Sequence, residues 1–274
     1  MTLTFTSMQT QHLPSAMRMS SEVKWPHRIE DWAFALDISR GVVALHDGKI
    51  VATALSTPYG SSAMSNLIIV DPSMRGRGLG RKVMERAMAT IDPATWHLVA
   101  TPDGLPLYEK LGFCTIGEVS QHQGVVASVD PMGEATWGNS THLPSIIELD
   151  RAASGMNRTS LYKALSKITR FAVLGADANI TGFAAIREFG RGKVIGPVVA
   201  PSIDDAKSLI SFVMSNHLGK FLRVDTDTDL GLGPWLKHCG LPKMGSGVRM
   251  QKGQPMATQA TPVTVFALAS QALG

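Results

Sequence analysis

The sequence predicts an α/β (α+β) protein of two similar modules, each a mixed, twisted and mostly antiparallel sheet with helices on both faces. Short apolar runs of strand length alternate along the chain with amphipathic stretches of helical period. One apolar run, which ends at Val70, leads into a glycine-rich turn and a helix. The pattern of the first half returns about 130 residues later, which indicates two copies of one folding unit.

The elements of the first module follow from local patterns. Residues 2–9 alternate like an edge strand, and Pro14 suits the first turn of a helix. Asp47-Gly48 lies between two apolar runs and predicts a hairpin. In chain order we expect a strand at 2–9, helices at 16–23 and 29–36, strands at 41–46, 50–57 and 63–70, a helix at 79–91, a strand at 96–100 parallel to the preceding one, a helix through Tyr108, and strands at 113–119 and 125–129.

The repeat keeps a nearly constant register. His12-Leu13-Pro14-Ser15 recurs as His142-Leu143-Pro144-Ser145, an offset of 130, and Tyr59-Gly60 aligns with Phe189-Gly190 at the same offset. His12 and His142 precede an apparent helix start in both copies, so we expect them to be structural. Residues 130–133 resemble a short linker. The predicted domains are therefore residues 1–130 and 131–274.

Composition narrows the possible classes. A chain of 274 residues with 44% hydrophobic and 18% charged residues suits two globular domains rather than disorder. No apolar run approaches the ~20 residues needed to span a bilayer, and the first residues lack a signal-peptide pattern, so we expect a cytoplasmic protein without a membrane partner. Cys114 and Cys239 support neither a disulfide framework nor a zinc site, and no metal is predicted. The net charge of +4 is scattered, which argues against nucleic-acid binding.

The glycine-rich turn is suited to a pyrophosphate. Its glycines allow backbone N–H groups to approach an anion, the helix that follows directs its positive end to the same place, and the arginines add positive charge. The spacing matches neither a Walker A loop nor a dinucleotide fingerprint. The residues expected to contact the ligand here are Arg75, Gly76, Arg77, Gly78, Leu79, Gly80 and Arg81.

Val70-Asp71-Pro72 followed by Arg75, Gly78 and Gly80 resembles the acetyl-coenzyme A motif of the GNAT superfamily of N-acetyltransferases. A second segment, from Leu107-Tyr108 to Gly112-Phe113, resembles the family's Leu-Tyr-x-x-x-Gly-Phe block. The resemblance implies acetyl-CoA as cosubstrate, with Ile68, Ile69 and Val70 along a splayed strand beside it. It also implies that the Val70 N–H binds the thioester carbonyl and that Tyr108 protonates the departing thiolate.

The second copy departs from the family where chemistry would occur. Ser202 to Lys207 replaces the glycine-arginine turn, and Asp204 and Asp205 would repel an anion. Leu236 aligns with Tyr108. The chain thus resembles the two-domain, tandem bacterial type with a degenerate C-terminal GNAT-like domain, and we expect one acetyl-CoA site in the first module.

The acceptor is less well defined. Acetyl transfer by direct attack requires a neutral amine, so a base or a water chain must remove a proton, and the candidate bases on the early helices are Glu22, His27, Glu30 and Asp31. Asp225 begins an acidic run that could recognise a cationic amine. Leu230 and Leu236 stand where a calcium loop needs glycine and glutamate, which argues against calcium.

We expect an N-acetyltransferase whose acceptor is a primary amine on a small molecule, enclosed by the second module, in a chain that is a monomer (a pseudo-dimer) or a homodimer. The alternative is a non-catalytic acyl-CoA-binding or sensory protein. Tyr108 favours the enzyme, since such a protein has no use for an acid beside the thioester.

Overall fold

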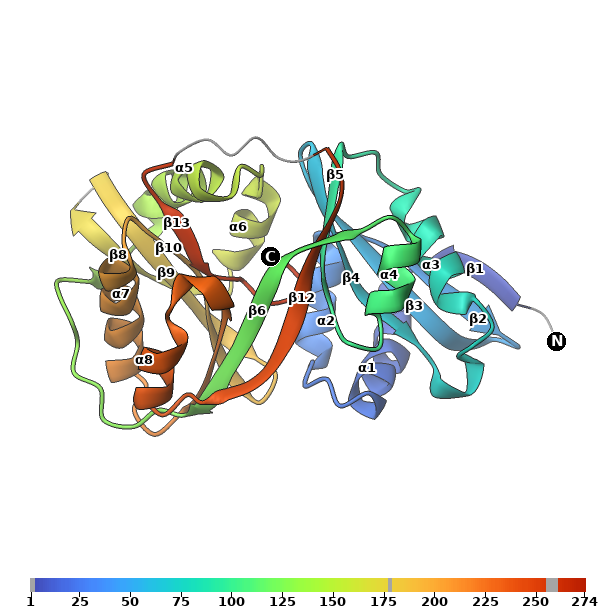
Figure 1. The fold of residues 1–274 in the computed structure, drawn as a ribbon, viewed down its shortest axis with the longest axis horizontal. Coiled ribbons are helices and arrows are strands. Elements are labelled where there is room, and N and C mark those ends of the chain that lie inside the picture. The colour runs from blue at the N-terminus through green and yellow to red at the C-terminus, as the bar shows by residue number, and fades with distance from the viewer. Residues whose placement is uncertain (1–2, 177–178, 255–260) are drawn as a thin grey trace.

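One continuous mixed sheet runs the length of the molecule and joins the two modules (Figure 1). The computed structural model describes residues 3–176, 179–254 and 261–274. Within them the strands follow the order β1-β2-β3-β4-β5-β12-β6-β11-β10-β9-β8-β7, and β13 pairs with β10 outside this path. The predicted α/β class, with a mixed and mostly antiparallel sheet, is confirmed.

The first module contains most of the expected elements in the expected order. They are β1 (Leu3–Ser7), α1 (Leu13–Glu22), α2 (Ile29–Asp37), β2 (Arg40–His46), β3 (Lys49–Tyr59), β4 (Ser62–Val70), α3 (Leu79–Met88), β5 (Thr95–Ala100), α4 (Leu105–Lys110) and β6 (Cys114–Val125). β5 runs parallel to β4, as predicted. Met1 and Thr2, where the first strand was expected to begin, lie outside the described residues.

The second module repeats this order. Its elements are β7 (Thr136–Trp137), α5 (Leu143–Ser154), α6 (Thr159–Leu165), β8 (Arg170–Ala176), β9 (Asn179–Phe189), β10 (Gly192–Ala200), α7 (Ile203–Ser215), β11 (Phe221–Asp227), α8 (Gly233–His238), β12 (Lys243–Gly253) and β13 (Thr264–Ala267). The repeated histidines have the same structural role: Nδ1 of His12 accepts the Gln9 N–H, and Nδ1 of His142 accepts the Asn139 N–H, each at 3.0 Å.

The last long strand of each repeat completes the sheet of the other. β6 pairs antiparallel with β11 from Val125–Phe221 to Val119–Asp227, while β12 pairs antiparallel with β5 and with the other edge of β6. Figure 1 shows β6 and β12 side by side across the middle of the molecule. The prediction of two strands at 113–119 and 125–129 was wrong: one strand runs to Val125, and residues 126–130 have no regular structure. β12 supplies the neighbour of β5 that a local hairpin would have supplied.

Helices cover both faces of the first module because residues on its strands alternate between two cores. Val43 packs with Trp32 and Leu13 in the cluster under α1 and α2. Val42 and Ala44 point the other way, into the cluster formed with α3. α3 ends at Met88, three residues before the predicted end at Ile91. The packing with Val42 and Ala44 fixes α3 against β2 and β3, and the N-terminus of α3 lies beside the end of β4.

In the second module, the parallel strands β10 and β11 separate after a short stretch of pairing. β10 and β11 pair only at Lys193–Leu222 and Val194–Arg223. Beyond that point β13 pairs with β10, and the β11 backbone joins it through Leu268 N–H to Asp225 O at 2.8 Å. A segment from the C-terminal end of the chain therefore fills the gap between β10 and β11.

Among the described residues, no helix has the length and apolar character of a membrane span. No group of three or more potential metal-binding side chains is found in the same residues.

Candidate active site

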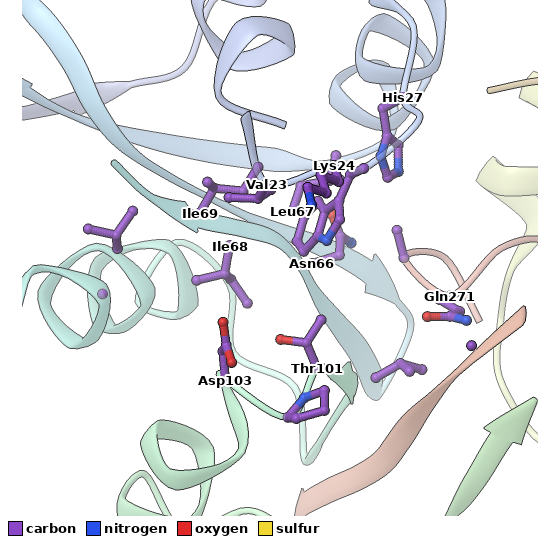
Figure 2. A pocket seen from close by; sticks show the side chains of 18 of the residues that line it. Val23, Lys24, His27, Asn66, Leu67, Ile68, Ile69, Thr101, Asp103 and Gln271 are labelled. Atoms are coloured by element: carbon purple, nitrogen blue, oxygen red, sulfur yellow. The ribbon is translucent and has the colours of Figure 1, made fainter. Parts of the chain in front are cut away.

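A large cleft opens where β4 and β5 diverge. The two strands pair over Ser62–Met64 and Thr95–His97 and then separate. The cleft has a volume of about 950 Å³, and residues of both modules line it. Figure 2 shows Ile68 of β4 across from Thr101 and Asp103 of the loop after β5. The separation leaves the second half of β4 without a strand partner on this side.

A bulge in β4 turns its backbone toward the cleft. Leu67 has a φ of 48°, and the pairing with β3 shifts register between Thr53 and Leu55. The Thr53 hydroxyl donates to the Leu67 carbonyl at 2.8 Å and holds the bulge. Beyond it, the Asp71 N–H donates to β3 at Val51 O, 2.9 Å away. Because backbone groups alternate sides along a strand, the Val70 N–H points away from β3, into the gap.

The glycine-rich turn follows directly. The Asp71 carboxylate accepts the Ser73 N–H at 2.9 Å and fixes the start of the turn. Gly76 and Gly78 have φ values of 76° and 70°, a region that favours glycine, and Gly78 caps α3. At Gly80 the space is tight, since a Cβ there would lie 3.3 Å from the Leu107 side chain and would require it to shift by a few tenths of an ångström. The turn thus directs the free N–H groups of the first helical turn into the cleft.

Positive charge accompanies these donors. The first turn of α3 contains no acidic residue, and Arg75 and Arg81 both line the cleft. The Arg75 Nε lies 3.4 Å from the Val70 carbonyl. Of the residues predicted to contact the cofactor, Ile68, Ile69, Val70, Arg75, Gly76, Gly78, Leu79, Gly80, Arg81 and Tyr108 line the cleft, and Arg77 does not.

Tyr108 lies on α4, on the opposite side of the cleft from β4. Its ring packs edge-on against Phe113 at 6.3 Å, and a Cβ at Gly104 would come within 2.8 Å of the ring. The side chain is 7% exposed, and burial raises the pKa of its phenol to about 12. The hydroxyl therefore keeps its proton at neutral pH and can act as a donor.

The second module closes the other end of the cleft. It contributes Phe189, Arg191, Arg223, Met244, Ser270 and Gln271. Opposite them, His27 follows α1, and Figure 2 shows it and Gln271 reaching the cleft from different elements. Burial, with Arg223 as the next cause, lowers the pKa of His27 to about 4, so its imidazole is neutral. Its Nδ1 has no hydrogen-bond partner among the described residues.

The predicted acceptor-binding carboxylates do not gather here. Neither Glu22 nor Glu30 lines the cleft, and Glu22 pairs with Arg18 instead. Asp225 is fully buried, and both its oxygens accept the Arg223 Nε–H, at 3.0 and 2.9 Å. Among the candidate bases, Asp31 is held by Arg28 and by the Gly190 N–H at 3.0 Å, whereas His27 does line the cleft.

The residues that sequence reasoning missed come chiefly from the second module. Arg223 and Gln271 are ordinary surface residues by sequence, and only the strand exchange and the path of the C-terminal segment bring them to the cleft. The one available signal was Arg223 itself, two residues before Asp225 on the same face of a strand.

Two family models match the chain, and both are described as an acetyltransferase (GNAT) domain. One matches residues 37–115 and the other residues 146–264, so the matches fall on the two repeats separately. Together they span well over half of the chain.

Related proteins agree with these matches. An uncharacterized N-acetyltransferase, YitH, of Bacillus subtilis is 25% identical over 81% of this chain and 81% of its own. A holothin acyltransferase of a Pseudoalteromonas species is 24% identical over 84% of this chain and 79% of its own. The crystal structure of a putative acetyltransferase from Pyrococcus horikoshii superposes with a TM-score of 0.85 and 17% identity, covering 99% of this chain and 96% of that one.

Proposed function

Because the chain belongs to the GNAT acetyltransferases and is a two-domain acyltransferase of that family, we propose that its first module, residues 1–130, moves an acetyl group from acetyl-CoA to a primary amine on a small molecule. The second module, residues 131–274, forms the acceptor end of the site. The observation that carries the proposal is the single cleft in which bulged β4, the glycine-rich turn and Tyr108 meet.

The proposed cosubstrate fits the donors on this surface. Its pyrophosphate carries negative charge, and the N-terminus of α3 offers free N–H groups beside Arg75 and Arg81. Arg77 is exposed in the same turn and adds charge there without lining the cleft. The extended arm of the cosubstrate would run along Ile68, Ile69 and Val70, where β4 lacks a neighbouring strand. These residues then position the thioester near Tyr108.

The mechanism we propose is direct attack. The acceptor amine loses a proton and attacks the thioester carbon, which places negative charge on the carbonyl oxygen. The Val70 N–H, directed into the gap, donates to that oxygen and stabilises it. As the tetrahedral intermediate collapses, the nitrogen gives up its second proton to water and the thiolate leaves, taking a proton from the Tyr108 hydroxyl. The raised pKa of Tyr108 keeps it protonated until then, and the phenolate regains its proton from water afterwards.

His27 is better suited to orient the amine than to deprotonate it. With a pKa of about 4 its imidazole is a weak base for an ammonium group whose pKa is ~10. The Nδ1 of His27 is buried, so we propose that the other nitrogen of the neutral ring, Nε2, accepts a hydrogen bond from an uncharged amine. We therefore propose that the proton leaves through water, and that His27 helps to hold the neutral amine.

Calorimetric titration with acetyl-CoA, followed by an assay of thiol release with a panel of small amines, tests this function. We expect one acetyl-CoA site per chain and amine-dependent release of CoA. Two sites would mean that the second module has kept its cofactor site. No binding, or binding without any amine-dependent turnover, would contradict the proposed function.

A further inference from the structure

The acceptor end of the cleft is rich in positive charge. Lys24, Arg191 and Arg223 line it, and Asp103 is the one acidic side chain along the cleft within the described residues. Lys24 and Arg191 are exposed at the mouth and make no ion pair in the part of the chain that the structure describes. This excess of positive side chains would repel an acceptor that carries several positive charges.

Arg223 is the deepest of these cations and is held rigidly. Its side chain is 9% exposed, and its Nη2 lies 2.9 Å from Asp225 Oδ2 in addition to the two contacts of Nε. The Gln271 amide donates to the same carboxylate at 3.3 Å. Asp225 is thus fully used, and it fixes the plane of the guanidinium by contacts along one edge.

The other edge of Arg223 is open. A guanidinium has five N–H donors; here the Nε–H donates to both oxygens of Asp225, and Nη2 is in ion-pair contact with Oδ2. Nη1 has no hydrogen-bond partner among the described residues, and the side chain, which is 9% exposed, lines the cleft. A built, oriented set of donors therefore faces the acceptor end without an acceptor of its own.

No neighbouring carboxylate can satisfy these donors. Asp31, the other buried acid nearby, is occupied by Arg28, by the Gly190 N–H and by Arg187 at 3.7 Å. Arg187 adds a second buried guanidinium, and both it and Arg223 lie against the Phe189 ring, at 4.9 and 5.3 Å from its centre. The local field is positive and remains so without a ligand.

An apolar surface lies beside the Arg223 guanidinium. The Phe189 ring meets His27 edge-on at 5.3 Å, and His27 meets Trp25 at 5.8 Å. Phe189, His27 and Trp25 all line the cleft. His27 is neutral and adds no charge. This end can therefore take a molecule with an apolar or aromatic body and one anionic group.

We propose that the acceptor is an amino-carboxylate, an amine that also carries a carboxylate, and that Arg223 determines this specificity by binding the carboxylate through its open edge. The inference rests on the proposed function, because it assigns the substrate class of the same site. A planar, singly charged carboxylate matches the fork of a guanidinium. A doubly charged phosphate would be repelled more strongly by Asp225 on the other edge of the same group.

Calorimetry with matched product-like probes tests the proposal. N-acetyl-phenylalanine and N-acetyl-alanine, each compared with its neutral amide, are titrated into the full chain with and without CoA. We expect each carboxylate to bind about tenfold or more tightly than its amide, since charge-assisted hydrogen bonds are lost in the amide. Equal affinities, or no binding of any probe, would overturn the proposal.

Variants show whether the preference comes from Arg223. Arg223→Gln alone leaves Asp225 buried and unpaired, so the double variant Arg223→Gln/Asp225→Asn is made with it. Either folded variant should bind carboxylate and amide within about twofold of each other. Arg249→Gln, which removes an arginine ion-paired with Asp227 outside the cleft, should keep the preference. A preference that survives in the double variant would contradict the role of Arg223.

Thiol-release assays distinguish this inference from the proposed function. Phenylalanine is compared with phenylalaninamide, whose amine is less basic and more readily neutral. A higher kcat/KM for the amino acid would support both proposals, since it runs against intrinsic reactivity. Turnover of the amide alone would leave the acetyltransferase assignment standing and overturn the carboxylate inference. Absence of acetyl-CoA binding would contradict the proposed function whatever the probes show.

Discussion

Each module has a gap between two parallel strands, β4 and β5 in the first and β10 and β11 in the second. The first gap is open, whereas a strand fills the second. In both modules the parallel strands pair briefly and then part. The first gap is open and leads to a glycine turn with no acid at the helix start. The second is filled by β13 and leads to α7, where Ser202 caps the helix and Asp204 and Asp205 occupy its first turn.

The comparison separates the fold from the binding site. A register shift interrupts β10 between Ile195 and Val198, as the bulge interrupts β4, although β13 fills the space beside it. Divergence of the strands is thus retained where another strand fills the gap. We expect access to the gap and the charge at the following helix to determine whether an anion binds.

Giving the first module the charges of the second should have the largest effect. In Arg75→Asp/Arg81→Asp, two cations that line the cleft become acids at a helix N-terminus, as in α7. We expect acetyl-CoA to bind about a thousandfold more weakly, because charge-assisted contacts are replaced by repulsion. Calorimetry measures the affinity.

The matched control reverses two exposed lysines, one in α6 and one in the turn after it, Lys163→Asp/Lys167→Asp, with the same change of net charge. Its acetyl-CoA affinity should stay within about threefold of the parent, because both residues lie outside the cleft. If control and test variants weaken equally, overall charge rather than the α3 turn governs binding.

Tyr108→Phe tests the catalytic difference between the copies. The aligned residue of the second module, Leu236, is fully buried in the core under α8. Without the Tyr108 hydroxyl, we expect kcat to fall about a hundredfold while acetyl-CoA affinity is unchanged, since only the proton donor is lost. Steady-state kinetics with any amine that is turned over, beside calorimetry, gives both values. The control Tyr162→Phe, in the core of the second module, should leave kcat unaltered. If kcat is also unchanged in Tyr108→Phe, Tyr108 is not the acid.

The parts of the first module predicted well were those encoded by short, local signals. The Asp47-Gly48 turn, the spacing around Trp32 and the glycines before α3 each act within a few residues, and the corresponding elements formed. The strand expected at 125–129 failed because its place beside β5 is taken by β12, more than a hundred residues away in sequence. Local patterns contain no information on which of two equivalent strands pairs with a given edge.

The acceptor end was missed for the same physical reason. Asp225 stood out by sequence as part of an acidic run, yet its carboxylate is buried because Arg223, two residues earlier, satisfies it. Gln271 reaches the cleft only because β13 enters the gap beside β10. Long-range pairing decides which side chains of the second module meet the first, whereas a motif can predict only its own neighbourhood.

Gly196→Ala tests whether the inserted segment or the lost glycine turn keeps the second gap empty of cofactor. A Cβ at Gly196 would lie 1.9 Å from the Leu268 carbonyl, so the segment after β13 must shift. We expect a loss of about 2–3 kcal/mol in the free energy of unfolding by urea.

The number of acetyl-CoA sites per chain should stay at one in Gly196→Ala, because α7 still begins with acidic residues. A second site would mean that β13 alone blocks binding. Gly117→Ala has a similar φ of 156° but only ordinary contacts, 3.8 Å at the closest, so it carries the backbone strain without the clash and should cost about 1 kcal/mol, less than Gly196→Ala.

A fall in pH should lower the stability of the first module before that of the second. This effect should be smaller than those of the preceding substitutions. Burial, and then Arg249, lowers the pKa of His97 in β5 to about 4, and its Nε2 has no partner among the described residues. Between about pH 6.5 and pH 4 the unfolded chain binds a proton at this side chain that the folded chain does not. The stabilisation is therefore complete above pH 6.5 and is lost as the pH falls through this window, with a loss of about 2 kcal/mol by pH 5.

His97→Leu removes this titration, so its free energy of unfolding should change less between pH 7 and pH 5 than that of the parent chain. His238→Gln, at an exposed position at the end of α8, is the matched control. Hydrogen exchange at pH 5 locates the effect: because His27 and His97 both lie in the first module, protection should fall first in β4 and β5. An equal loss of protection in β4 and β10 would instead mean that the shared sheet makes the two modules unfold as one unit. The difference between the two gaps would then have no effect on local stability.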